Sequence, residues 1–307
     1  MTTKRVFHAI LWLAIVAPFA EASGRVVARA LTALQDSGKA NSVSSPNAPS
    51  VSREAVKEAD RRYKNGVEQG LAGRFAEAVE SFQQALALNP RHKDAHFGLG
   101  HALFDLGRWA HAAQELKIAV SLNPRDAEAH HMMGFAFSKL GDHVQAADAF
   151  RQAVIVKPDW AKAHYDLGSA LFRLGKFSDA AGHYLQVTTL NSSDPEAYND
   201  LGATYGELKR YGDAFNALIK AVKLRPAFAA AHNNLGLIHL RQGRQAEAAD
   251  AFRVALRYSP EDSVVSSNLQ LAVTGPVAKI SLPQQADDRF SAIHRQPPYL
   301  RKLKETT

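Results

Sequence analysis

The apolar and polar positions between residues 59 and 262 repeat with a period of 34 residues. Within each period, apolar residues recur at spacings of three and four, which is typical of amphipathic helices. A proline lies near the end of five of the six periods: Pro90, Pro124, Pro158, Pro226 and Pro260. A fixed period of this length indicates an array of repeats. We therefore divide the region into six frames: 59–92, 93–126, 127–160, 161–194, 195–228 and 229–262.

Small residues hold fixed places in every frame. The eighth place is glycine: Gly66, Gly100, Gly134, Gly168, Gly202 and Gly236. The twentieth place is alanine, and four places later comes a large residue: Phe82, Leu116, Phe150, Tyr184, Leu218 and Phe252. We expect the small residues to let two helices approach while the large residue fills the space beside them. A glycine also stands between the two halves of five frames, where a turn favours positive φ, and Lys209 replaces it in the fifth. Each frame is therefore predicted to be helix–turn–helix.

This arrangement of small, large and proline places resembles the tetratricopeptide repeat (TPR) family. The resemblance implies an all-α, right-handed solenoid of six helix pairs, in which each repeat contacts only its neighbours. Residues 263–275 contain one more amphipathic segment with no partner helix after it, and we interpret them as a capping helix.

The segments outside the repeats suggest an exported protein. Residues 1–22 combine a basic start, an apolar run and an Ala20-Glu21-Ala22 cleavage pattern, in the order of a secretory signal peptide. The alternative is an uncleaved membrane anchor formed by residues 6–20; without it we expect no stable membrane span. We expect a periplasmic or secreted protein, with a short helix and flexible linker over 23–58 and a disordered tail over 276–307.

Charge and composition narrow the functions to be considered. The chain carries a formal charge of +7 and no cysteine, but residues 59–262 contribute only +1. A nucleic-acid-binding domain would concentrate basic residues on its folded part, so we expect no nucleic-acid partner. No nucleophile, zinc-protease or phosphate-loop motif is present, and we expect neither enzymatic activity nor a cofactor.

The histidines were considered as metal ligands. His96, His130, His164 and His232 share the fourth place of their frames, so we expect them to perform one packing role four times rather than bind metal. His101 and His131, with Asp105 and Glu128 nearby, could form a metal or anion site on adjacent first helices. We favour an exposed polar patch that contacts a protein ligand, and we predict no metal site.

The resemblance further implies a concave groove lined by the first helix of each pair. Carried onto this sequence, the peptide-binding positions are Tyr63, Phe97, His101, Phe104, His131, Phe135, Lys162, Tyr165, Phe172, Arg173, Asn199, Asn233 and Arg241. Six of these are aromatic residues in the first four frames. They would form either an exposed binding stripe or packing contacts between adjacent first helices, and the sequence does not separate the two.

These observations predict a non-catalytic interaction scaffold that binds a peptide or protein in its groove. One alternative is a glycan-binding or cell-envelope assembly or export accessory protein, because aromatic groove residues would also stack on sugars. Another is a regulatory portion related to glycosyltransferases that contain similar repeats, although the chain has no segment large enough for a catalytic domain.

Overall fold

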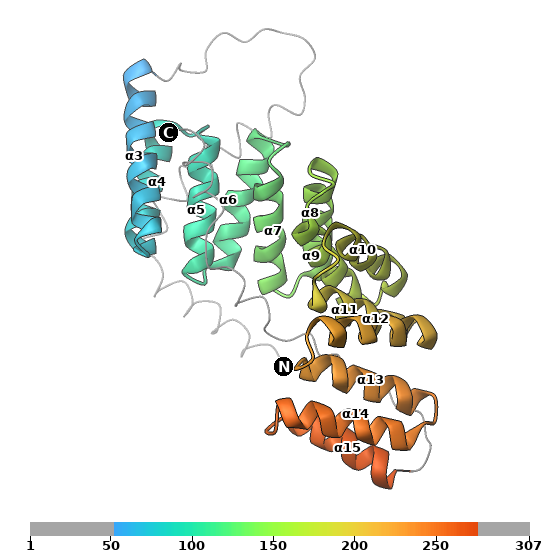
Figure 1. Ribbon diagram of the computed structural model, residues 1–307. Coiled ribbons are helices and arrows are strands. Elements are labelled where there is room, and N and C mark those ends of the chain that lie inside the picture. Colours follow the sequence, from blue (N-terminus) through green and yellow to red (C-terminus); the bar gives the residue numbers. More distant parts are fainter. Residues whose placement is uncertain (1–51, 276–307) are drawn as a thin grey trace, which may run out of the picture. The chain divides into compact units, whose positions relative to one another are not determined.

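The computed structural model describes residues 52–275, and these residues form α-helices joined by short turns (Figure 1). The predicted signal peptide, most of the segment 23–58 and the tail 276–307 lie outside the described residues. Six helix pairs follow one another, and a last helix ends the series. The helices are α3 (Arg53–Leu71), α4 (Phe75–Leu88), α5 (Lys93–Asp105), α6 (Trp109–Leu122), α7 (Ala127–Lys139), α8 (His143–Val156), α9 (Ala161–Arg173), α10 (Phe177–Leu190), α11 (Pro195–Glu207), α12 (Tyr211–Leu224), α13 (Ala229–Arg241), α14 (Gln245–Tyr258) and α15 (Ser263–Thr274). The predicted all-α solenoid is confirmed.

The helix α3 begins earlier than the first frame suggested. It starts at Arg53, directly after Ser52, whose hydroxyl accepts a hydrogen bond from the amide of Ala55. Serine is a favourable N-cap because its oxygen satisfies one of the free amides of the first turn. Residues 53–58 therefore extend the first helix and do not belong to the linker.

The turns inside the pairs confirm the role of the periodic glycines. Gly73, Gly107, Gly141, Gly175 and Gly243 have φ between 71° and 77°. Lys209 has the corresponding φ of 59°, which is the single positive value for a non-glycine residue among those described. This region of φ is strained for a residue with a Cβ atom. The fifth pair thus keeps the turn geometry of the others at a conformational cost.

The eighth-place glycines make room for the large residue of the second helix. A Cβ atom on Gly134 would lie 2.6 Å from the ring of Phe150, and one on Gly236 would lie 2.5 Å from that of Phe252. Both phenylalanines are completely buried. The predicted close approach of two helices is therefore the central packing contact of each pair.

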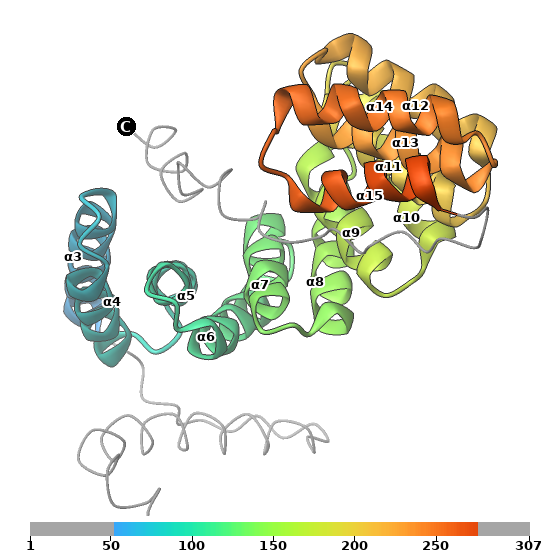
Figure 2. The ribbon, with the colours of Figure 1, turned by 90° about the horizontal axis from the view of Figure 1, so that it is seen from below.

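The two helices of a pair lie in different layers of the stack. Successive first helices contact one another, as α3 does α5 and α11 does α13, while each second helix packs chiefly on the first helices before and after it. The first helices thus form one layer of the series and the second helices the other, as α5 and α6 show in Figure 2. The helix axes also turn gradually along the stack, from α3 to α15 (Figure 1).

The apolar core is continuous over the first pairs and divided over the last. One cluster of buried residues extends from Val67 on α3 to Ala217 on α12. A second joins α12 to α13, and a third joins α13 and α14 to α15. The core of the last pairs is therefore built from smaller units.

Candidate functional site

Seven of the thirteen predicted groove residues have partly exposed side chains on the first helices. They are Tyr63, Phe104, Lys162, Tyr165, Phe172, Arg173 and Arg241. The other six are buried: Phe97, His101, His131, Phe135, Asn199 and Asn233. The inner helices therefore present a smaller surface than the sequence suggested.

Of the two interpretations left open for the six aromatic residues, packing holds for two of them. Phe97 and Phe135 are only 3% and 2% exposed. The ring of Phe135 packs edge-on against that of Phe150, with centroids 5.3 Å apart, so it belongs to the interior of its pair. Tyr63, Phe104, Tyr165 and Phe172 pack against the same core while remaining partly exposed, and these four form what is left of the stripe.

The expected exposed patch around His101 and His131 is wrong, because both imidazoles are buried. His131 Nε2 lies 2.6 Å from Asp166 Oδ2 on the next first helix, and Trp160 packs on the imidazole with ring centroids 4.5 Å apart. Burial lowers the pKa of His131, although Asp166 opposes the shift. His101 Nδ1 lies 3.1 Å from Asp105 Oδ2 on its own helix. His131 thus joins neighbouring repeats, and neither imidazole is displayed to a ligand.

The contact between His131 and Asp166 is the first of four equivalent polar contacts. Each joins a fifth-place residue to the sixth place of the next frame, 35 residues later. Tyr165 donates to Asp200, and Asn234 donates to Asn199 at 2.9 Å. Asn268 donates to Asn233 at 3.0 Å. We call these four contacts the polar ladder; they run from α7 to α15.

The polar ladder changes the interpretation of the predicted asparagines. Asn199 and Asn233 use their side-chain carbonyls to hold the next helix, and both are nearly inaccessible to solvent. The sequence did carry a signal for this role, because His131/Asp166, Asn199/Asn234 and Asn233/Asn268 are polar pairs with a constant separation. This constant separation becomes visible only when the residues of neighbouring frames are compared in pairs.

The cationic side chains of the inner surface are concentrated on α9. The ammonium of Lys162 lies 5.5 Å from the ring centroid of Phe135, and partial burial lowers its pKa. Arg173 is partly exposed at the other end of the same helix. Arg241 instead donates to the carbonyl of Gly206 at 2.8 Å and to Glu207 at 3.2 Å, so it serves the contact between α11 and α13.

Four of the seven partly exposed groove residues belong to α9: Lys162, Tyr165, Phe172 and Arg173. They combine aromatic and cationic groups along one helix in the middle of the stack. Carboxylates form strong hydrogen bonds with such cations, and aromatic rings are favoured anchors for partners. The α9 residues are therefore the best candidate for a binding site on the inner layer.

The fourth-place histidines perform the single packing role that was predicted. The Nε2 atoms of His96 and His130 each lie 3.1 Å from the carbonyl of the proline six residues earlier, and those of His164 and His232 lie 2.9 Å from theirs. Because a carbonyl only accepts, Nε2 carries the proton in each case. Each histidine thus anchors the connection between two repeats.

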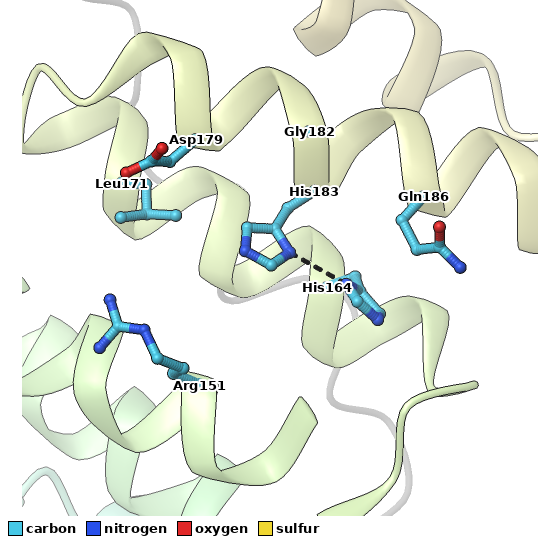
Figure 3. Close-up of a pocket in the computed structure, with 7 residues that line it drawn as sticks. All are labelled: Arg151, His164, Leu171, Asp179, Gly182, His183 and Gln186. Atoms are coloured by element: carbon cyan, nitrogen blue, oxygen red, sulfur yellow. Dashed lines mark hydrogen bonds between the residues drawn. The ribbon is translucent and has the colours of Figure 1, made fainter. Parts of the chain in front are cut away.

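A hollow of about 400 Å³ lies between α8, α9 and α10 (Figure 3). Its lining comprises Arg151, His164, Leu171, Asp179, Gly182, His183 and Gln186. His164 and His183 point toward each other inside it. No group of three histidine, aspartate or glutamate side chains within residues 52–275 is arranged to hold a metal ion.

Comparison with known proteins places the chain in a family. Models of the tetratricopeptide repeat match residues 71–134, 131–197 and 199–263, which together cover most of the helix pairs. The chain therefore belongs to the tetratricopeptide repeat family, whose members typically act as protein-interaction scaffolds.

Individual relatives support the fold. The crystal structure of MamA protein aligns with a TM-score of 0.53 and 23% identity over 56% of this chain and 94% of that one. YrrB, a TPR protein with an unusual peptide-binding site, aligns with a TM-score of 0.56 and 19% identity over 63% and 100%. PilF of Pseudomonas aeruginosa gives 0.56 and 16% over 71% and 99%. An uncharacterized protein of Methanocaldococcus jannaschii is 44% identical over 50 residues, which are 16% of this chain and only 58% of the relative.

None of the helices between residues 52 and 275 has the length and apolar character needed to cross a bilayer.

Proposed function

We propose that the protein is an exported, non-catalytic scaffold that binds a peptide or protein segment across its first helices, centred on α9. The observation that carries this proposal is the group Lys162, Tyr165, Phe172 and Arg173, which places partly exposed aromatic and cationic side chains on one inner helix. A ligand that suits this group has an apolar side chain near an acidic one. The family supports the proposal, since its members bind protein or peptide partners.

Contacts within the protein hold the aromatic side chains of α9 in place, which favours binding without rearrangement. The ring of Tyr165 packs edge-on against that of Tyr184, with centroids 5.6 Å apart, and its hydroxyl donates to Asp200. The ring of Phe172 packs edge-on against that of Phe177 at 5.1 Å. Side chains already held in place lose little entropy when a ligand arrives. YrrB, with its peptide-binding site, provides a precedent on the same fold.

The proposal is tested by selecting ligands from a displayed peptide library on the purified chain. The double variant Lys162→Glu/Arg173→Glu reverses both cationic groups of α9. Because charged hydrogen bonds contribute about 1.5–3 kcal/mol, we expect its affinity for selected peptides to fall at least about tenfold. Calorimetry provides the measurement.

A matched control reverses an equivalent charge elsewhere. Lys223 is exposed on the second helix α12, so Lys223→Glu should leave the affinity unchanged. Equal losses in both variants would refute a site on α9. Binding to a glycan array in the absence of any selected peptide would favour the glycan-binding alternative instead.

A further inference from the structure

The hollow between α8, α9 and α10 contains two histidines within hydrogen-bonding distance of each other. His164 Nδ1 and His183 Nδ1 are 3.0 Å apart (Figure 3). His164 Nε2 lies 2.9 Å from the carbonyl of Pro158, so that nitrogen carries a proton and Nδ1 of the neutral ring presents a lone pair. The tautomer and ring orientation of His164 are therefore set by the backbone.

We infer that this histidine pair is a binding site for a divalent transition-metal ion such as Cu²⁺, Ni²⁺ or Zn²⁺. Imidazole nitrogens bind zinc at about 2.0–2.1 Å, so two nitrogens on one ion at 90–110° are separated by about 2.9–3.4 Å. The observed 3.0 Å falls within this interval. An ion bound to both nitrogens replaces the proton but lies to one side of the line that joins them, so both imidazoles turn slightly toward it.

The proton balance of binding needs no further reactant. In the neutral pair, His183 donates its Nδ1 proton to the lone pair of His164. Transfer of the His183 proton from Nδ1 to Nε2 gives the other neutral tautomer and frees a second lone pair at Nδ1. Both nitrogens can then donate to the ion, and the net charge of the pair does not change.

The surroundings suit a metal-binding histidine. Ligand histidines usually donate their second ring N–H to a carbonyl or carboxylate, and the bond from His164 to Pro158 has this form. Gly182 has no atom within 4 Å of where a Cβ would stand, so the hollow is open beside His183. The remaining coordination positions are left to water, since no third protein ligand is arranged there.

The charges around the hollow are of both signs. Arg151 and Asp179 both line it, and the guanidinium of Arg151 is paired with Asp148 on the same helix. Burial and Arg151 lower the pKa of His183 and Asp179 opposes them less strongly, so Asp179 offsets the arginine only in part and binding depends on the two nitrogen lone pairs. Borderline ions such as Cu²⁺, Ni²⁺ and Zn²⁺ are the ones that imidazole ligands suit.

The other repeats provide a natural comparison for this pair. In the second pair of helices, the nitrogen His96 Nδ1 faces Glu115 Oε2 at 2.7 Å. In the third and sixth pairs, the place of His183 is taken by Ala149 and Ala251. Among the fourth-place histidines, His164 is thus the one that faces a second imidazole.

The experiment uses the full chain without a histidine tag, freed of metal and titrated with Cu²⁺. We expect one ion bound per chain and electron paramagnetic resonance showing two coordinated nitrogens. His183→Ala should lower the affinity by more than about tenfold. His183→Gln is the second variant, because its amide can still donate to His164, and melting temperatures verify that both variants fold.

The decisive comparison is a variant that should gain a second metal site. Ala251→His places an imidazole on a partly buried position opposite His232, as His183 stands opposite His164, and should add a second ion. The inference is overturned if the wild type and His183→Ala bind Cu²⁺ with the same affinity and stoichiometry. Peptide capture at α9 is measured separately, so failure of one idea leaves the other intact.

Discussion

The first two junctions between neighbouring first helices are apolar at the ladder places, whereas the four that follow are polar. Tyr63 and Gly98 hold these places between α3 and α5, and Phe97 and Met132 hold them between α5 and α7. From α7 onward the polar ladder joins each helix to the next. The continuous core cluster ends at α12, where the ladder consists of asparagines. One fold thus stacks its repeats in two ways.

The polar and apolar junctions differ in how precisely they fix the geometry of neighbouring helices as well as in how strongly they hold them. Apolar contacts depend on buried area and tolerate small shifts, while hydrogen bonds need particular atoms at particular distances. A buried polar pair also penalises any arrangement that separates it, because unpaired polar groups are costly away from water. We therefore expect the ladder to fix the register of the later repeats, and the predictions below test this contrast.

The largest effect is expected where the ladder is charged. His131→Ala leaves the carboxylate of Asp166 buried without its imidazole donor, and an unsatisfied buried charge costs more unfolding free energy than a neutral group, for which the cost is about 1–3 kcal/mol. Urea denaturation provides the measurement. The double variant His131→Met/Asp166→Leu removes both polar groups and should recover most of the loss. If the double variant is as unstable as the single one, lost volume and not the unpaired charge is responsible.

A smaller effect is expected at the neutral end of the ladder. Asn233→Ala removes the acceptor of the Asn268 amide, which is also buried, and should cost about 1–3 kcal/mol. The apolar counterpart Met132→Leu conserves volume and should cost less than about 1.5 kcal/mol. Comparable losses in the two variants would mean that the polar and apolar junctions are energetically alike.

The two kinds of junction also show which features of the structure could be predicted from the sequence. The helix pairs, their turns and the contacts between the eighth-place glycines and the large apolar residues were predictable, because each depends on residues within one period. Exposure at the fifth and ninth places was not, since it depends on the residue that the neighbouring repeat brings against it. Phe97 and Asn199 occupy equivalent places, and both are buried for different reasons. The family resemblance locates the inner helices without revealing which side chains they leave open.

Acidification should weaken the later repeats. The histidines whose pKa is lowered by burial are His131, His143, His183 and His239, all on α7 or later helices. The unfolded chain then binds more protons than the folded one below the ordinary histidine pKa of about 6.5, so stability falls as the pH drops. Urea midpoints at pH 7.5 and 5.5 measure this. His131→Gln should reduce the pH dependence; an unchanged dependence would exclude His131 as its source.

The smallest effect is expected at Lys209, the departure from the turn pattern. Its φ of 59° is strained for lysine, while glycine adopts it freely. Lys209→Gly relieves this strain but increases the freedom of the unfolded chain, so the expected gain in unfolding free energy is modest, about 0.5–1 kcal/mol. Gly107→Ala, at the equivalent turn after α5, should lose a similar amount. A higher unfolding free energy for Lys209→Gly would show that the turn of the fifth pair is strained. A lower one would show that contacts of the lysine side chain stabilise the turn by more than the backbone strain costs.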